Sequence, residues 1–352
     1  MSEIHFDPYN TMADIKLNIL YITKDGLYLH HENDVLKVEE KSTTLLKIPI
    51  HHLQGITIMS LSNISPSLIQ KCMSLGIYVS FLSNRGRFMG RLEGANAGNV
   101  LLRKKQFRIT DIEKIKISKL IIAGKIQNQR VNLLRTARDM KNESLETEIR
   151  DVVKSLEEIL PRLETADSLD SIRGFEGICA KNYFSVFDHC ILTQKEEFTF
   201  KNRTKRPPRS RVNALLSFAY SMITNECISA LQAVGLDPFV GLLHEERPGR
   251  PSLALDLVEE FRPFADRFIL TLLNRKQIQK SDFEEREGSV YLLNANGRKT
   301  FLTAYQNRKA EEITHYYLDQ SCTISELFLL QARLLARAIR DEKETYIPYI
   351  WR

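Results

Sequence analysis

The sequence lacks the motifs that define several large enzyme classes. It has no glycine-rich phosphate loop followed by Lys-Ser or Lys-Thr, no Gly-x-Ser-x-Gly elbow and no cysteine pairs at zinc-binding spacing. It also has no low-complexity segment and no internal repeat at the period of a solenoid. These absences argue against ATP hydrolysis, acyl transfer through serine and structural zinc.

Cysteines are few and far apart, and long apolar runs are missing. No apolar run reaches the ~18 residues of a membrane-spanning helix, and no basic segment followed by an apolar core stands at the N-terminus. The cysteines are odd in number and lie mostly in apolar, helix-like surroundings, which predicts buried free thiols in a reducing compartment. They are Cys72, Cys179, Cys190, Cys227 and Cys322. We therefore expect a soluble, cytoplasmic protein without membrane contact.

The composition is that of an ordinary globular protein. With 352 residues, 43% hydrophobic and 27% charged, the chain exceeds the usual size of one domain. From residue 17 to residue 92, short β-favouring runs alternate with turn formers, and one helix begins after Ser65 and ends at Gly76. Helical spacing of apolar residues dominates later. The pattern predicts an α+β chain with a small, mainly β domain over residues 1–97 and a larger, mostly α-helical domain over residues 98–352.

Basic residues are concentrated in two clusters on a mildly basic chain. The formal net charge is +6 and the pI is near 8.9. Such clusters favour a polyanionic partner, nucleic acid before membrane, although either cluster can also be a solvated run of charge. They consist of Arg103, Lys104, Lys105 and Arg108, and of Lys201, Arg203, Lys205, Arg206, Arg209 and Arg211.

The segment from His244 to Pro263 combines a histidine with two carboxylates. A loop with two prolines and a glycine follows His244, and Ser252 is expected to cap the helix after it. This helix is expected to end at Pro263, with another helix continuing to about Asn274. The loop would act as a spacer that lets the histidine face the helix.

Asp256 and Glu259 lie three residues apart in this helix and therefore share a face. Their neighbours are mostly apolar, so the two carboxylates would repel each other unless a positive group, such as a metal ion, lies between them. The alternative is a solvated face of an amphipathic helix, with Arg250 and Arg262 as surface partners. His244, taken alone, is more often a partly buried histidine with its hydrogen bonds satisfied than a ligand.

A third carboxylate stands beside two glycines. Glu176 has Gly174 and Gly177 close to it, and each glycine costs a helix about 1 kcal/mol relative to alanine. Their presence suggests that something approaches the backbone closely beside Glu176. The alternative is a loosely packed helix start with a solvated glutamate.

Together, Glu176, His244, Glu259 and Asp256 would supply a mixed oxygen and nitrogen ligand set. Such a set favours magnesium or manganese over zinc. A metal ion in this setting suits phosphodiester chemistry, because it polarises a phosphoryl oxygen and favours deprotonation of a hydroxyl nucleophile. With the basic clusters as counter-charge for a DNA or RNA backbone, the residues indicate a nucleic-acid phosphoryl transferase.

Several longer motifs resemble one known family. They occur in a compatible order and, with the β-rich beginning, cover nearly the whole chain: AGKIQNQRVNLLR, GFEGICAKNYF, RPPRSRVNALLSFAY, LDPFVGLLHEERPGRPSLALDLVEEFRP, GRKTFLTAY and YIPYIWR. The motifs are similar to those of the CRISPR-associated spacer-acquisition endonuclease and integrase family, the universal first Cas protein (Cas one).

The resemblance implies an N-terminal β domain that mediates homodimerisation and a helical catalytic domain. In the family, a dimer of a small companion adaptation protein (Cas two) bridges two such homodimers. The implied activity is metal-dependent nuclease and integrase action on double-stranded DNA, in which captured prespacer DNA is inserted beside the first repeat of a CRISPR array. The expected chemistry is an in-line attack of a DNA 3′-hydroxyl on a phosphate at the repeat boundary.

Position by position, the metal ligands of the family fall on Glu176, His244 and Glu259, with magnesium or manganese as the ion. Many members have aspartate where this chain has Glu259, which is a minor departure for a carboxylate ligand. Asp256 is the expected accessory acid, which orients His244 or a metal-bound water. The candidate phosphate contacts are Arg209, Arg211 and Arg250.

Two rival functions stay open on the sequence. A non-catalytic DNA-binding scaffold would share the basic clusters and would be favoured if Glu176, His244 and Glu259 lay more than about 10 Å apart. A stand-alone repair nuclease that acts on branched DNA would share the whole site. Only a comparison of substrates separates that nuclease from an integrase.

Overall fold

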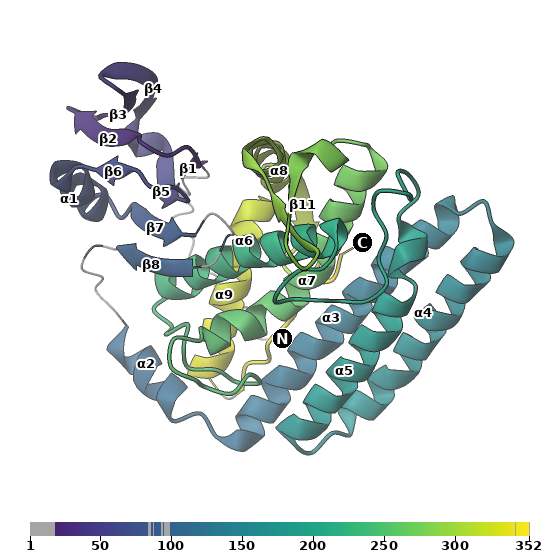
Figure 1. Cartoon of the computed structure of the whole chain (residues 1–352). Coiled ribbons are helices and arrows are strands. Elements are labelled where there is room, and N and C mark those ends of the chain that lie inside the picture. Colours follow the sequence, from purple (N-terminus) through teal and green to yellow (C-terminus); the bar gives the residue numbers. More distant parts are fainter. Residues whose placement is uncertain are drawn as a thin grey trace. The chain divides into compact units, whose positions relative to one another are not determined.

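The computed structural model describes residues 18–351 except 84, 85, 87, 93, 95–98 and 342. Its contacts divide the chain into two units, Met1–Asn96 and Ala97–Arg352, and Figure 1 labels the elements of both. The boundary predicted between residues 97 and 98 falls outside the described residues.

The described part of the N-terminal unit is mainly β, with one α-helix between strands. Ser65 caps this helix by accepting from the backbone N–H of Leu68, and Pro66 occupies its first turn. Gly76 follows in the left-handed region, with φ of 68°. The elements are β1 (Asn18–Ile22), β2 (Tyr28–Glu32), β3 (Val35–Glu40), β4 (Thr43–Pro49), η1 (Ile50–His52), β5 (Leu53–Ile58), β6 (Asn63–Ile64), α1 (Pro66–Ser74), β7 (Tyr78–Leu82) and β8 (Phe88–Leu92).

These strands form two four-stranded sheets around a shared apolar core. One sheet has the order β1-β5-β7-β8, in which the first three strands are parallel and β8 is antiparallel to β7. The other has the order β4-β3-β2-β6, in which β6 is parallel to β2 and the remaining pairs are antiparallel. Side chains from both sheets and from α1 meet in one cluster, which includes Leu29, Ile56, Leu68 and Val79.

The second unit is dominated by long helices and carries two short hairpins. Its elements are α2 (Val100–Phe107), α3 (Asp111–Asp139), α4 (Glu143–Glu164), α5 (Leu169–Ser185), η2 (Phe187–Cys190), α6 (Arg211–Ala233), α7 (Ser252–Asn274), η3 (Lys280–Asp282), β9 (Phe283–Arg286), β10 (Val290–Leu293), α8 (Ala295–Lys309), β11 (Glu312–His315), β12 (Gln320–Thr323) and α9 (Ile324–Arg340). The predicted α+β class, with the β-rich part first and a larger helical part second, is confirmed.

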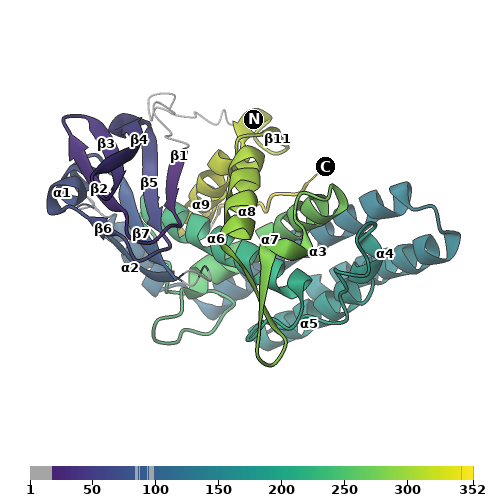
Figure 2. The same cartoon turned by 45° about the horizontal axis from the view of Figure 1, so that its top comes forward.

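Helix α7 lies at the centre of the second unit, because it packs against both α3 and α6. Figure 2 shows α3, α4 and α5 as a neighbouring layer, coloured blue to teal. Helix α6 is long and apolar enough to cross a membrane by length and composition, but 72% of its most apolar window is buried within the protein. Such burial is typical of a core helix. The five cysteines are free and buried, as predicted.

Helix α7 continues through Pro263, where the sequence predicts a break. A proline lacks an N–H and leaves a carbonyl oxygen of the preceding turn without its helical donor. Two side chains of α3 bond the backbone of α7 close to this point: Asn128 Nδ2 donates to the Glu260 carbonyl oxygen (3.1 Å), and Asn132 Nδ2 donates to the Pro263 carbonyl oxygen (2.6 Å). One helix therefore runs from the candidate site to Asn274.

Candidate active site

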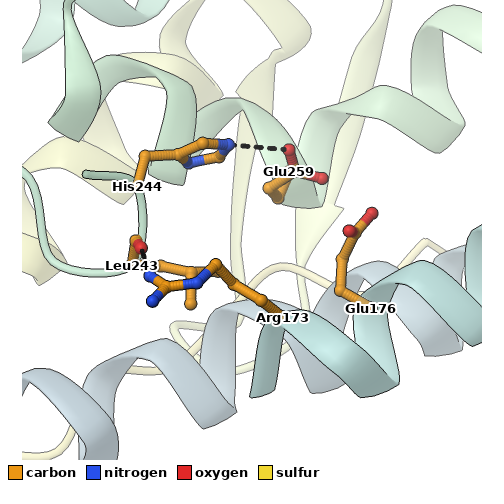
Figure 3. Close-up of a pocket in the computed structure, with 5 residues that line it drawn as sticks. All are labelled: Arg173, Glu176, Leu243, His244 and Glu259. Atoms are coloured by element: carbon orange, nitrogen blue, oxygen red, sulfur yellow. Dashed lines mark hydrogen bonds and ion pairs between the residues drawn. The ribbon is translucent and has the colours of Figure 1, made fainter. Parts of the chain in front are cut away.

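Three of the predicted site residues meet in one cavity of the helical unit. The cavity has a volume of about 120 Å³ and is lined by Arg173, Glu176, Leu243, His244 and Glu259 (Figure 3). Glu176 comes from α5, His244 from the loop before α7, and Glu259 from α7. This convergence is the opposite of the wide separation that would favour a non-catalytic scaffold.

Asp256 is fully buried behind His244 (0% exposed). The backbone N–H groups of Leu242 and Leu243 donate to its Oδ2 (2.6 and 3.1 Å), and that of His244 donates to its Oδ1 (2.9 Å). His244 Nδ1 lies 2.7 Å from the same Oδ1, and because a carboxylate only accepts, Nδ1 carries the proton. The Nε2 lone pair is left on the side of Glu259, at 3.9 Å from its Oε1.

The loop from Gly241 to Pro251 places His244 against α7. A Cβ at Gly241 would lie 2.6 Å from the carbonyl oxygen of His244 and from the Cβ of Ser252, so glycine is required there. Ser252 is the first residue of α7 and not its cap, which corrects the prediction. The Ser252 hydroxyl instead donates to the Glu245 carbonyl oxygen (2.9 Å) and ties the two ends of the loop together.

Glu259 is buried (4% exposed) between two cations. Arg262 Nε donates to its Oε1 at 2.9 Å, and Lys125 Nζ donates to its Oε2 at 2.6 Å. Burial alone would raise the pKa of this carboxyl, but the Arg262 guanidinium and the Lys125 ammonium hold that pKa well below its ordinary value. Because Asp256 is buried as well, a solvated helix face is the wrong interpretation for both carboxylates.

Glu176 is less enclosed, with 29% of its side chain exposed, and it accepts from the same Lys125 ammonium. A Cβ added at Gly174 or Gly177 would meet nothing within 4 Å. No described part of the chain therefore approaches the backbone at these glycines, and the expectation that something approaches it stays a prediction. They leave an open strip of α5 beside Glu176.

Two cations of the site were missed by the sequence-based prediction. Lys125 of α3 joins the two carboxylates, and Arg262, expected as a surface partner, pairs with the buried Glu259. The signal that identifies Lys125 is its spacing: it forms a row with Asn128 and Asn132 on one face of α3. All three are buried, and buried polar groups need partners.

The donor set of this cavity suits a divalent cation. Two carboxylates and an imidazole nitrogen line it, and these are groups that Mg²⁺ or Mn²⁺ accepts as ligands. Among the described residues, no three His, Cys, Asp or Glu side chains are close enough to hold a metal ion as they stand. The Lys125 ammonium lies between the two carboxylates. The space between the carboxylates therefore already holds a cation of the protein. Because these oxygens accept positive charge there and the imidazole nitrogen lines the same cavity, the residues present fit a metal ion.

Behind Glu259, Arg262 packs on an aromatic ring whose hydroxyl is bonded to another buried acid. The Arg262 guanidinium carbon lies 4.6 Å from the centre of the Tyr220 ring, and the Tyr220 hydroxyl donates to Asp266 Oδ1 at 2.6 Å. Burial raises the pKa of the Asp266 carboxyl from 3.8 to about 6, against the opposing effects of Tyr220 and Arg262. This layer positions the guanidinium that pairs with Glu259.

Asp266 is expected to make the stability of the chain pH-dependent. Because its pKa is higher in the folded than in the unfolded chain, its stabilising contribution is complete below pH ~4 and is lost as the pH rises through ~6. The change is on the order of 3 kcal/mol. Urea unfolding should show that, from pH 4.5 to pH 7.5, the free energy of unfolding of the wild type falls relative to that of Asp266→Asn. A pH-independent difference between the two proteins would contradict this expectation.

The predicted phosphate contacts lie outside the cavity and differ in their surroundings. Arg209 is exposed on the basic loop before α6. Arg211 is engaged within the protein: it donates to the Glu197 carbonyl oxygen (3.0 Å), and its guanidinium carbon lies 4.8 Å from the centre of the Tyr291 ring. Arg250 is half-buried in the loop before α7. Of the three, Arg209 is the most available to a DNA backbone.

Known proteins share this sequence over most of its length. The family described as CRISPR associated protein Cas1 matches residues 20–307. The CRISPR-associated endonuclease Cas1 of Leptospira interrogans is 56% identical over 254 residues, which cover 72% of this chain and 100% of the relative. The CRISPR-associated endonuclease Cas1 1 of Chlorobaculum tepidum is 42% identical over 339 residues, which cover 96% of this chain and 99% of the relative.

Solved structures share the fold. A casposase bound to integration product has a TM-score of 0.79 at 23% identity, and the match covers 94% of this chain and 92% of that one. A chain of a Cas6-RT-Cas1–Cas2 complex also has a TM-score of 0.79, at 22% identity, with 96% of this chain and 36% of that chain covered. The family match and the two relatives show that the chain belongs to the CRISPR-associated Cas1 family.

Proposed function

We propose that this chain is a metal-dependent DNA endonuclease and integrase that inserts new spacer DNA into a CRISPR array by transesterification with a DNA 3′-hydroxyl. The observation that carries the proposal is the convergence of Glu176, His244 and Glu259 on one cavity, with Asp256 bonded to the far side of the imidazole. The names of the relatives, which are CRISPR-associated endonucleases, and the integration product bound to the similar casposase support the same chemistry.

Glu176, His244 and Glu259 would hold a magnesium or manganese ion, which when bound polarises a phosphoryl oxygen and favours deprotonation of the attacking hydroxyl. Asp256 keeps the proton of His244 on Nδ1, so that Nε2 is the nitrogen available as a ligand. The DNA 3′-oxygen forms the new bond to the phosphorus at the repeat boundary, and the bond from that phosphorus to the 3′-oxygen of the flanking nucleotide breaks. The released oxygen takes up a proton and becomes a 3′-hydroxyl, while the end of the repeat is joined to the incoming DNA. No protein side chain has to act as a covalent nucleophile.

We expect positive side chains beside the cavity to contact DNA phosphates. Arg173 lines the site cavity and a wider adjoining cavity of about 390 Å³, and its Nη1 is held by the Leu243 carbonyl oxygen at 2.7 Å. The basic loop before α6 also reaches Tyr220: the Arg203 guanidinium carbon lies 5.4 Å from the centre of the Tyr220 ring, which also contacts Arg262. Arg173 and the exposed Arg209 would supply counter-charge for the backbone of a DNA duplex.

Arg209→Gln is expected to weaken duplex binding about equally for all sequences and to lower the slope of log affinity against log salt by ~1, because an exposed arginine of this kind contacts phosphate. Arg211→Gln is the matched comparison, because its guanidinium is already engaged by Glu197 and Tyr291. Fluorescence anisotropy over a salt series measures both slopes. A larger change in Arg211→Gln than in Arg209→Gln would overturn the assignment.

The proposed assembly is a homodimer formed through the N-terminal unit, with a dimer of the companion protein Cas2 bridging two homodimers. Family membership and the similar chain of the Cas6-RT-Cas1–Cas2 complex support it. The DNA partners are the prespacer duplex and the CRISPR repeat array. Acting in the cytoplasm, the complex would serve antiviral defence by storing fragments of invading DNA.

The test is an integration assay with a labelled 3′-hydroxyl duplex and a supercoiled plasmid that carries the repeat array, with and without Cas2. We expect labelled plasmid that depends on Cas2 and on magnesium or manganese and that disappears with chelator. A branched DNA junction is assayed in parallel. Cleavage of the junction without any integration, whether Cas2 is present or absent, would replace this proposal by that of a stand-alone repair nuclease.

A further inference from the structure

Lys125 plays no part in the proposed reaction, yet its ammonium lies at the centre of the site. Its side chain is 5% exposed and joins Glu176 of α5 to Glu259 of α7, at 2.6 Å from Glu259 Oε2. It reaches them from α3, which packs against both of these helices. The two carboxylates that would bind a metal ion are therefore already held together by a side chain of the protein.

The two carboxylates that line the cavity are already neutralised by cations of the protein. Glu176 and Glu259 carry two negative charges, and Lys125 and Arg262, which are paired with them, carry two positive charges. A divalent ion added to this set would bind the same carboxylates at contact distance from two fixed cations, and like charges this close repel strongly in a buried site. Entry of the ion therefore requires one of the two cations to move.

Arg262 is the less mobile of the two. Its planar guanidinium is fixed by Glu259 on one side and by the ring of Tyr220 on the other. Lys125 carries a compact ammonium on a flexible four-carbon stem, and the hydrogen bonds described for that ammonium go to the two carboxylates. When those oxygens turn to another cation, the Lys125 stem can swing away.

We infer that Lys125 holds Glu176 and Glu259 in position in the metal-free protein and that a divalent cation binds by displacing its ammonium. This inference rests on the proposed function, since it concerns the same metal site. Lys125 is then an intramolecular competitor of the metal. It prevents two carboxylates from repelling each other while the site is empty, and it lowers the affinity of the site for the ion.

The first test measures Mn²⁺ affinity by electron paramagnetic resonance in the wild type, Lys125→Met and Lys116→Met. Lys116 is an exposed residue of α3, so its substitution removes the same charge from the same helix. Lys125→Met is expected to bind Mn²⁺ at least about tenfold more tightly than the wild type, and Lys116→Met to match the wild type. Equal or weaker binding by Lys125→Met overturns the inference but leaves the proposed function intact. Absence of Mn²⁺ binding in all three proteins overturns both.

The second test uses the wild type alone and does not depend on the folding of a variant. Crystal structures are determined with and without Mn²⁺, and the anomalous signal locates the ion. With the ion bound to Glu176, His244 and Glu259, the Lys125 ammonium is expected to have left at least one of its two carboxylates. Persistence of both Lys125 ion pairs beside the bound ion overturns the inference.

Discussion

A protein in which Glu176 is replaced by glutamine is expected to lose integration of a 3′-hydroxyl duplex by more than about 100-fold, because loss of a mere supporting group of a metal site already costs 10–100-fold. Glutamine keeps the size of the side chain but removes the charge that makes it a ligand. The same loss is expected for His244→Ala, which removes the nitrogen donor. The measurement is the initial rate of duplex joining to a plasmid that carries the repeat array, at saturating Mn²⁺.

Glu158→Gln is the matched control, since Glu158 is an exposed glutamate of α4. It should join DNA at the wild-type rate. Circular dichroism and duplex affinity should be nearly unchanged in all three variants, because the substitutions leave the helices and the basic loop in place. Full activity in Glu176→Gln or in His244→Ala would exclude that residue from the reaction.

Asp256→Ala is expected to lower the free energy of unfolding by about 3–5 kcal/mol. The substitution leaves the backbone N–H groups of Leu242, Leu243 and His244 without their acceptor in a place that is 0% exposed. Asp151→Ala, an exposed aspartate of α4, should change the stability by less than about 0.5 kcal/mol. Urea unfolding compares the two, and similar stabilities would show that the loop before α7 does not depend on this carboxylate.

Asp256→Asn separates the structural role of this residue from its effect on His244. Asparagine keeps one oxygen acceptor for the backbone N–H groups and should lose less stability than alanine. Its amide N–H can donate to Nδ1 and so favours the proton on Nε2, which removes the lone pair from the cavity side. Integration should therefore fall more steeply than stability in this variant.

Elements whose signals lie within their own segment are predictable from this sequence. Helix α1 is an example, because Ser65 and Gly76 mark both of its ends locally. The continuation of α7 through Pro263 is not, because the contacts that hold this part of the helix come from α3: Asn132, which stands 131 residues earlier in the chain, donates to the Pro263 carbonyl oxygen. No pattern within the segment 252–274 contains that information.

The residues of the candidate site also fall into those that the sequence identifies and one that it does not. His244, Asp256, Glu259 and Glu176 were identified because the chemistry of these residue types is legible in the sequence. Lys125 was not, since a lysine in a helix is ordinarily solvent-exposed. Its spacing with Asn128 and Asn132 marks a polar row on α3, but its carboxylate partners lie 51 and 134 residues away, so the groups that it meets follow only from the packing of α3 against α5 and α7.

The most direct test of the central claim compares prespacer duplexes that end in a 3′-hydroxyl with duplexes that end in a 3′-deoxy nucleotide. Both are incubated with the protein, Cas2, Mn²⁺ and a supercoiled plasmid that carries the repeat array, and covalent joints are mapped by sequencing. The account predicts joints at the repeat boundary with 3′-hydroxyl ends and none with 3′-deoxy ends. Joints formed from 3′-deoxy ends, or no joints from either duplex, would contradict it.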